Sequence, residues 1–345
     1  MKLPEAVATL VAGHSLKALQ CAQAFEELLD PATSDANIAA FLRALRAKGE
    51  NADEIAGAAK TMLARALPVD LGAGDELLDT CGTGGDRIGT FNISTGAALI
   101  AAAAGVKVAK HGNRAASGRV GGADVLEALG VKLDPPIEGL RRCLERAGIC
   151  FLFAPKFHPA LVRLAPIRRA IGVRTIFNLL GPLCNPAQAG RRLIGVADKS
   201  LARPVAEAAL ALDLKHLLVI HSDDGLDEIS SNAQTTLISV RNGRLSETRL
   251  DPRSVGIAPG RPNEIVISSL NQAVSMLRES LASQGGGAHD VLALNGGAAI
   301  YVGGRADSIE EGISLARDVL REGRALATLE ALRSQSRGGC IEFDT

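Results

Sequence analysis

Short apolar segments that alternate with helical ones, from Leu77 onward, constrain the fold of this chain most strongly. We expect strands at residues 77–79, 106–109, 149–153, 193–197, 216–221 and 291–295. Helical patterns lie between them, and this alternation is typical of an α/β domain with a mostly parallel central sheet. The dipeptide Asn242-Gly243, between two alternating segments, further predicts a β-hairpin.

The first 67 residues carry helical patterns only. Ser34 begins one predicted helix, which Gly49 ends. Asn51 and Glu54 form the capping-box pattern that begins the next helix. Breaks at Pro68 and at the following glycines end this pattern. The sequence therefore predicts a small helical unit in front of the α/β region.

A domain boundary is expected near residue 70. The stretch 158–186 interrupts the α/β rhythm, because it is helical and bounded by prolines. We expect these helices to return to the N-terminal unit, which makes that unit discontinuous in sequence. The predicted division is a small discontinuous helical domain, 1–70 joined by helices from about 158–186, and a larger α/β domain over 71–345.

Composition excludes several classes of protein. Of 345 residues, 47% are hydrophobic and 22% are charged, so the chain can bury a substantial core. The longest apolar run, 97–104, is too short to cross a membrane, and the six cysteines form no Cys-x-x-Cys pair. Lys plus Arg equals Asp plus Glu at 38 each, so phosphate binding has to be local. We expect a soluble, cytoplasmic protein.

The segment DTCGTGGDRIGTFNIST, residues 79–95, places a glycine-rich loop between a strand and a helix that begins near Ser94. Glycines let backbone N–H groups approach a ligand closely, and the helix N-terminus adds partial positive charge. Such a loop favours phosphate, although a tight strand-to-helix turn fits the same pattern. It is neither a dinucleotide fingerprint nor a P-loop, because Arg87 replaces a glycine and Gly89-Thr90 lacks the lysine.

A second polar loop, AKHGNRAASGRVGGAD at residues 109–124, follows the next predicted strand. It combines cationic, amide and hydroxyl side chains with small residues: Lys110, His111, Asn113, Arg114, Ser117 and Arg119. This set suits phosphate or pyrophosphate, whereas an isolated basic loop is more often only solvated. Ligands in open α/β sheets gather beyond the carboxyl ends of strands, so two such loops favour a shared site.

The segment HSDDGLDEIS carries four carboxylates directly after the strand expected at 216–221. Asp227 and Glu228 are adjacent oxygen donors of the type that Mg²⁺ uses when it also keeps waters and phosphate oxygens. Taken alone, the segment fits an acidic surface turn. Beside a pyrophosphate site it predicts magnesium, which would neutralise charge on a departing group.

The helical stretch 158–186 contains the pair Arg168 and Arg169. Most paired arginines are exposed to solvent. An arginine that faces a cleft instead binds a planar carboxylate through two parallel hydrogen bonds. Arg168 is therefore a candidate contact to a substrate that carries a carboxylate.

The motifs GTGGD with TFNIST, KHGNRAAS, GADVLEALG, RTIFNLLGPLCNPA and DGLDEIS, in this order and spacing, closely resemble the anthranilate phosphoribosyltransferase family. The similarity runs from AAFLRALRAKGENADEIAGAA to GGAAIYVGG and covers nearly the whole chain. It implies the nucleoside phosphorylase and phosphoribosyltransferase fold, in which a small helical domain is hinged to a larger α/β domain. It also implies a homodimer formed through the helical domains.

That family moves the phosphoribosyl group of phosphoribosyl pyrophosphate (PRPP) onto the amine of anthranilate, with Mg²⁺, in tryptophan synthesis. The resemblance assigns PRPP to Gly82, Gly85, Asp86, Thr90, Asn92, Ile93, Ser94, Thr95, Lys110, His111, Gly112, Asn113, Arg114, Ala115, Ala116, Ser117, Gly118 and Gly122. It assigns magnesium to Ser94, Asp227 and Glu228. It assigns anthranilate to Gly82, Asn113 and Arg168, of which Asn113 and Arg168 position the amine for catalysis.

The implied catalysis is mainly electrostatic. The amine of anthranilate is a weak nucleophile because it is conjugated to the ring, so the pyrophosphate leaves early and C1′ becomes oxocarbenium-like. Magnesium and the loop N–H groups stabilise the departing charge, while Asn113 and Arg168 aim the amine at C1′. We expect no covalent enzyme intermediate and no side-chain nucleophile.

Four positions depart from the family pattern. Arg87 stands where glycine is common, Val120 where serine or cysteine is usual, and Gly122 where serine is frequent. The changes at Val120 and Gly122 remove hydroxyl contacts to phosphate. Leu161 lies in a stretch where an aromatic residue would form the outer wall of the anthranilate site.

Two other functions fit parts of the pattern. A pyrimidine-nucleoside phosphorylase of the same fold would use phosphate and a nucleoside, and KHGNR together with DGLDE disfavours it. A non-catalytic relative that binds nucleic acid would need a basic stripe, and the balanced charge disfavours it. We therefore expect small-molecule substrates, and neither a nucleic acid nor a membrane as partner.

Overall fold

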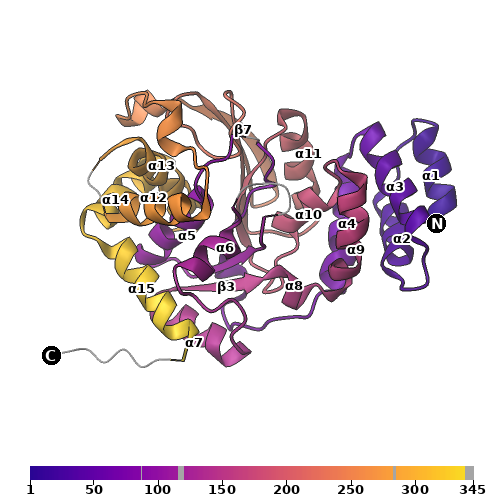
Figure 1. Cartoon of the computed structure of the whole chain (residues 1–345). Helices are drawn as coiled ribbons and strands as arrows, with labels where there is room; N and C mark the ends of the chain where they lie inside the picture. Colours follow the sequence, from indigo (N-terminus) through magenta and orange to yellow (C-terminus); the bar gives the residue numbers. More distant parts are fainter. Residues whose placement is uncertain (87, 116–119, 283–284, 339–345) are drawn as a thin grey trace.

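The computed structural model describes residues 1–86, 88–115, 120–282 and 285–338. Figure 1 shows a group of N-terminal helices beside a larger body in which helices flank a central sheet. The strands are β1 (Leu78–Thr80), β2 (Val108–Gly112), β3 (Ile149–Phe153), β4 (Arg191–Gly195), β5 (His216–Ser222), β6 (Thr235–Arg241) and β7 (Arg244–Leu250). They form one seven-stranded sheet in the order β3-β2-β1-β4-β5-β6-β7.

The sheet is mostly parallel, as the sequence predicts. Strands β1 to β5 pair in parallel, and β6 and β7 pair antiparallel at one edge. The hairpin between β6 and β7 turns at Asn242 and Gly243, whose φ angles are 51° and 70°. Positive φ at both central residues is what a type I′ turn requires. The predicted hairpin is therefore confirmed.

Both faces of the sheet are covered. Successive side chains of a strand point to opposite faces, so Leu217 and Val219 of β5 enter one core while Leu218 and Ile220 enter another. The second core is completed by α5 (Ile93–Ala103), α6 (Gly122–Ala128), α7 (Ile137–Ala147), α12 (Leu270–Ala282), α13 (Gly287–Val302), α14 (Ile309–Arg321) and α15 (Arg324–Ser336). This two-sided burial is typical of parallel sheets.

The other face carries α11 (Lys199–Leu210) and, beyond it, the N-terminal helices. These helices are α1 (Leu3–Val11), α2 (Ala18–Leu29), α3 (Asp35–Lys48) and α4 (Ala52–Ala64). The predicted helix starts are confirmed: Ser34 Oγ accepts from Asn37 N at 3.3 Å, and Asn51 and Glu54 bond reciprocally at 2.9 and 3.0 Å. No helix of the described residues is long and apolar enough to cross a membrane.

The stretch expected to rejoin the N-terminal unit forms α8 (Ala154–Phe157), α9 (Pro159–Ile171) and α10 (Phe177–Leu183). Helices α9 and α10 pack against the bundle; the ring of Phe177 lies 5.7 Å from that of Phe25. The same core continues into α11 and the sheet. The boundaries 1–70 and 71–345 therefore remain predictions. Short 3₁₀ helices complete the chain: η1 (Gly74–Glu76), η2 (Pro252–Val255) and η3 (Pro262–Ile265).

One predicted strand is wrong. Residues 291–295 lie in the middle of helix α13 and not in a strand. This helix is buried on nearly every side, so its sequence lacks the polar face that marks a helix. A short apolar run is ambiguous between a buried strand and a buried helix. The predicted strands at 106–109 and 193–197 exist, but they span 108–112 and 191–195, so each begins two residues away from its predicted start.

Candidate functional site

One cavity lies where several strands end. Because β1, β2 and β5 run parallel, the segments that follow them reach the same edge of the sheet. The strand order also reverses around β1, which is the type of position where open α/β sheets bind ligands. A cavity of about 370 Å³, hereafter the chamber, is lined by these segments and by residues of α8, α9 and α10.

Most of the predicted site residues line the chamber. They are Gly82, Gly85, Asp86, Thr90, Asn92, Ile93, Ser94, Lys110, His111, Gly112, Asn113, Arg114, Ala115, Gly122, Arg168, Asp227 and Glu228. Thr95 is the exception: it is buried, does not line the chamber, and its Oγ1 would lie 3.3 Å from a Cβ on Gly122. Ala116, Ser117 and Gly118 lie outside the described residues, as does Arg87.

The backbone of the glycine loop closely approaches the carboxylate of Asp227. Gly84 and Gly85 have φ angles of +64° and +84°, which favour glycine. Asp227 Oδ2 accepts a hydrogen bond from Gly84 N at 2.9 Å. A Cβ on Gly82 would lie 2.8 Å from the same oxygen. The sequence motif therefore also reflects the close approach of an acidic side chain from the end of β5.

The acidic pair is buried, with Asp227 8% and Glu228 9% exposed. Burial, followed by repulsion from Asp86, raises the pKa of Asp227 to about 7. Burial, followed by repulsion from Asp227, raises the pKa of Glu228 well above its ordinary value. A cation bound in the chamber would stabilise carboxylates that are desolvated in this way.

Magnesium fits this donor set. No group of three or more His, Cys, Asp or Glu side chains among the described residues could hold a metal by itself. Magnesium needs no such cage, because it is commonly bound by one or two carboxylates together with substrate phosphates and waters. Asp227 and Glu228 supply hard oxygen donors, and Ser94 Oγ lies in the same chamber, 3.3 Å from Lys110 Nζ.

A buried polar cluster forms hydrogen bonds with the first residues of the second loop. Lys110 is 3% exposed and donates to the carbonyl of Thr80, at the end of β1. Asp79 Oδ1 accepts from the backbone N–H of His111 at 2.9 Å, and its Oδ2 accepts from Asn185 Nδ2 at 2.8 Å. The structural roles of Asp79 and Asn185 were missed in the sequence. Their only signal was a polar residue inside each of two motifs, DTCGTGG and LCNPA.

Two histidines present unprotonated nitrogens. His111 Nδ1 lies 3.1 Å from Gly181 O and His158 Nε2 lies 2.9 Å from Cys184 O, with the two rings 5.3 Å apart. A carbonyl only accepts, so these nitrogens donate. The other two, His111 Nε2 and His158 Nδ1, are buried and unpartnered among the described residues. Burial lowers the pKa of each histidine to about 4, so both are neutral acceptors. His158 was missed in the sequence.

The two predicted arginines, Arg168 and Arg114, differ in their ion pairing within the protein. Arg168 lines the chamber with its guanidinium 5.2 Å from the centre of the Phe177 ring. Burial lowers the pKa of Arg168, but a guanidinium keeps its charge in proteins. Among the described residues, no carboxylate forms an ion pair with it, so its charge is available to a ligand.

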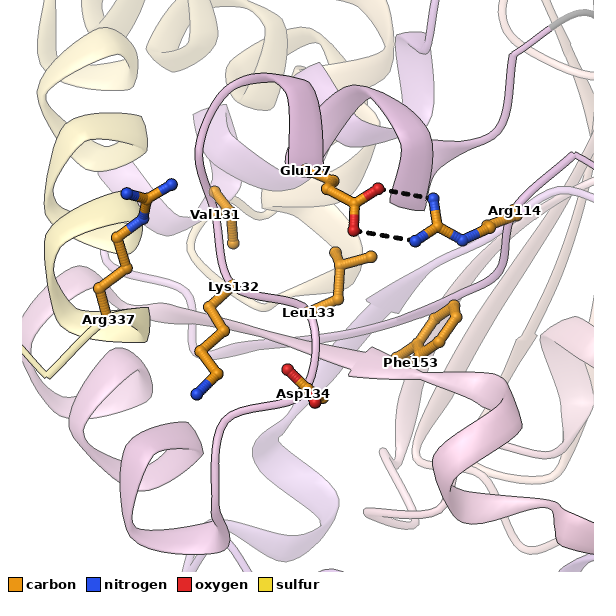
Figure 2. Close-up of a pocket in the computed structure, with 8 residues that line it drawn as sticks. All are labelled: Arg114, Glu127, Val131, Lys132, Leu133, Asp134, Phe153 and Arg337. Atoms are coloured by element: carbon orange, nitrogen blue, oxygen red, sulfur yellow. Dashed lines mark hydrogen bonds and ion pairs between the residues drawn. The ribbon is translucent and has the colours of Figure 1, made fainter.

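Arg114 instead has its charge neutralised within the protein. Its guanidinium bonds Glu127 at 2.7 and 2.9 Å and Asp124 at 3.0 Å, and lies 5.8 Å from the Phe153 ring centre. Figure 2 shows this pairing at the edge of a second cavity of about 590 Å³. Arg114 nevertheless lines the chamber, so its assignment to the PRPP site stays a prediction.

Arg174, which sequence reasoning missed, lies against the glycine loop. A Cβ on Gly85 would be 3.3 Å from Arg174 Nη1, so the guanidinium packs directly on that glycine. Its Nη2 is buried without a hydrogen-bond partner among the described residues. Burial lowers the pKa of Arg174, and the carboxylate of Asp227 partly opposes that shift. The motif RTIFN contains this arginine, but nothing in the local pattern indicates its distant contact.

Comparison with protein families accounts for almost the whole chain. Residues 4–66 match the helical bundle domain of a glycosyl transferase family, and residues 74–326 match the α/β domain of the same family. An anthranilate phosphoribosyltransferase from Roseiflexus castenholzii is 46% identical over 334 residues, which are 96% of this chain and 98% of that protein.

Solved structures agree with this comparison. The anthranilate phosphoribosyltransferase of Thermus thermophilus superposes with a TM-score of 0.89 at 39% identity, over 96% of this chain and 99% of that one. The Saccharomyces cerevisiae enzyme in complex with PRPP and Mg gives a TM-score of 0.86 at 26% identity, over 97% and 98%. The same yeast enzyme has also been solved with 4-fluoroanthranilate.

Proposed function

Since this chain belongs to the anthranilate phosphoribosyltransferases of that glycosyl transferase family, we propose a division of the reaction among the residues of its chamber. The activity is transfer of the phosphoribosyl group of PRPP to the amine of anthranilate, in tryptophan biosynthesis. The observation that carries the proposal is the meeting of two glycine-rich loops, a buried acidic pair and a free guanidinium in one chamber.

The glycine loop, the second loop and the start of α5 bind the pyrophosphate and the sugar. Backbone N–H groups of a glycine loop and of a helix N-terminus are suited to phosphate oxygens, and both line the chamber. Asp227 and Glu228 hold magnesium, with Ser94 as a further oxygen donor. When bound, the metal ion supplies positive charge beside the pyrophosphate oxygens.

Anthranilate binds against Arg168, Asn113 and the two histidines. The guanidinium of Arg168 takes the carboxylate of the substrate, because it is charged, partly buried and has no carboxylate partner in the part of the chain that the structure describes. The unprotonated nitrogens of His111 and His158 accept hydrogen bonds from the amine. These contacts hold the weakly nucleophilic nitrogen in place, so that orientation contributes much of the rate.

The helices α9 and α10 connect this site to the N-terminal bundle, and we propose that residues 1–70 and about 158–186 form one hinged domain. Packing of α9 and α10 against the bundle supports this division.

We also place the reaction in the cytoplasm. The described cysteines are unpaired, as is usual in a reducing compartment.

The direct experiment follows the loss of anthranilate fluorescence after addition of PRPP and Mg²⁺. We expect a rate that requires both PRPP and Mg²⁺. The double variant D227N/E228Q should lower this rate strongly. A rate and a magnesium requirement unchanged in this variant would contradict the assigned metal site. Replacing PRPP and anthranilate by phosphate and thymidine tests a nucleoside phosphorylase, and turnover of thymidine would overturn the proposed substrate assignment.

A further inference from the structure

Helix α13 reaches the acidic pair through one buried side chain, Asn295. Its Oδ1 accepts from the backbone N–H of Ile229 at 2.9 Å, and its Nδ2 donates to the carbonyl of Ile229, also at 2.9 Å. The same Nδ2 donates to Val291 O at 2.9 Å within the helix. One amide therefore satisfies both polar groups of the residue that follows Glu228.

A second side chain, that of Ser222, binds the peptide that joins Glu228 to Ile229. Ser222 Oγ, at the end of β5, donates to the carbonyl of Glu228 at 2.7 Å. The peptide between Glu228 and Ile229 thus has its oxygen bound by Ser222 and its nitrogen bound by Asn295. Both side chains are fully buried. The plane of this peptide is fixed from two elements far apart in sequence.

Fixing this plane fixes the direction in which Glu228 leaves the backbone. The neighbouring Asp227 is restricted as well, because a Cβ on Gly195 would lie 1.6 Å from its carbonyl oxygen. The two carboxylates therefore project from a backbone that is restrained by Asn295, Ser222 and Gly195. A rigid backbone matters here because two buried neighbouring carboxylates, in the ionised form that binds a metal, would repel each other and separate if they were free to move.

We propose that Asn295 is a positioning residue for the metal site: through Ile229 it holds Glu228 where the carboxylate binds magnesium together with Asp227. This inference rests on the proposed role of the acidic pair. A residue that only filled the core would affect stability alone. A residue that orients a metal ligand changes metal affinity, typically by 10- to 100-fold.

The test compares N295A and N295S with E228Q and with a control, S336A. Ser336 is also buried and its Oγ accepts from a distant backbone N–H, that of Lys132, at 3.0 Å, but it does not line the chamber. The measurements are the half-saturating Mg²⁺ concentration for turnover, the KM for anthranilate at saturating Mg²⁺, and Mn²⁺ binding with PRPP present, followed by electron paramagnetic resonance of free Mn²⁺. Thermal unfolding checks that each variant is folded.

We expect N295A and N295S to weaken Mg²⁺ and Mn²⁺ binding by about 10-fold or more, with the KM for anthranilate changed less than about twofold. S336A should lose stability without a change in metal binding. N295S replaces the amide by a smaller polar group, a hydroxyl, and is the second variant to measure if N295A does not fold. Wild-type metal binding in a folded Asn295 variant, while E228Q is impaired, would overturn this inference alone. Wild-type metal binding in E228Q would overturn the proposed metal site itself.

Discussion

Asp227 is restrained by several close contacts in the chamber. Its carboxylate accepts from Gly84 N, lies 2.8 Å from where a Cβ on Gly82 would be, and sits beside the carboxylate of Asp86. Its backbone carbonyl lies against Gly195. Two glycines from two segments, Gly82 and Gly195, thus make space for one acidic residue.

Gly195→Ala tests this packing. The added Cβ would meet the carbonyl oxygen of Asp227 at 1.6 Å, and no rotamer change can relieve a Cβ contact with backbone. The end of β4 or the acidic turn has to move, so we expect a loss of about 1–3 kcal/mol in the free energy of unfolding. Urea denaturation measures it, and the half-saturating Mg²⁺ concentration should rise in parallel. If neither the free energy of unfolding nor the half-saturating Mg²⁺ concentration changed, the acidic turn would tolerate displacement and this prediction would be wrong.

Metal binding should depend on pH through Asp227. Its pKa is about 7 in the metal-free protein, so the side chain is partly protonated near neutral pH. The metal requires the deprotonated form, and affinity therefore weakens as pH falls below 7 and levels off above it. Calorimetric titration of Mg²⁺ with PRPP in two buffers of different ionisation enthalpy counts the protons released. We expect release at pH 6.5 that declines by pH 8.5; no proton release at pH 6.5 would contradict a raised pKa.

Arg168→Gln should separate the two substrates. Removing a charged hydrogen bond to a carboxylate costs about 1.5–3 kcal/mol, which corresponds to roughly 10- to 150-fold in kcat/KM for anthranilate. The KM for PRPP should change little. Arg169→Gln is the matched control, because Arg169 is exposed on the same helix. Equal effects of both variants, or a larger effect on PRPP, would remove Arg168 from the anthranilate site.

Individual residues were predictable where motif and chemistry coincide. Asp227, Glu228 and the glycines stand in short polar segments that follow strands, Lys110 lies near the end of β2, and parallel pairing brings these positions together. Three other residues, Asn295, Arg174 and His158, could not be predicted in this way. Each of these acts through a contact with a residue distant in sequence, and no local pattern encodes such a contact.

At the scale of elements, glycines also set the distance between helices of the bundle. Helices α2 and α4 cross at Gly57, where a Cβ would lie 2.2 Å from the carbonyl oxygen of Ala18. Gly57→Ala should therefore lower the free energy of unfolding by about 1–3 kcal/mol, although alanine favours helices by about 1 kcal/mol over glycine. Chemical denaturation measures the change. A more stable variant would mean that the helices separate without loss.

Elements were predictable from sequence when one face was polar or when a turn had its own signal. The capping residues Ser34 and Asn51 and the Asn242-Gly243 turn are examples, because each bonds within a few residues of itself. Helix α13 was mistaken for a strand because tertiary packing surrounds it. Its glycines 296 and 297 lie against α5 and α14, and only the folded protein shows why small residues stand there.

At the scale of the whole molecule, the fold class could be predicted because the strand and helix rhythm of an α/β domain is a property of the full chain. The division into domains is less visible. One core runs from the bundle through α11 to the sheet, and α9 and α10 belong to it. Hydrophobic patterning marks each of these helices as amphipathic or buried, but does not say which neighbour covers it.

The bundle also carries exposed apolar side chains that a monomer would leave in water. Val11 of α1 is 74% exposed and Leu19 of α2 is 71% exposed. We expect a homodimer formed through this domain, in which such residues are covered. The variant V11E/L19E should then sediment as a monomer at concentrations where the wild type sediments as a dimer, because a buried unpaired charge is strongly unfavourable. L210E, on α11 at 40% exposure, is the control and should remain dimeric. A dimer that persists in V11E/L19E and dissociates in L210E would move the interface from the bundle to the α/β domain.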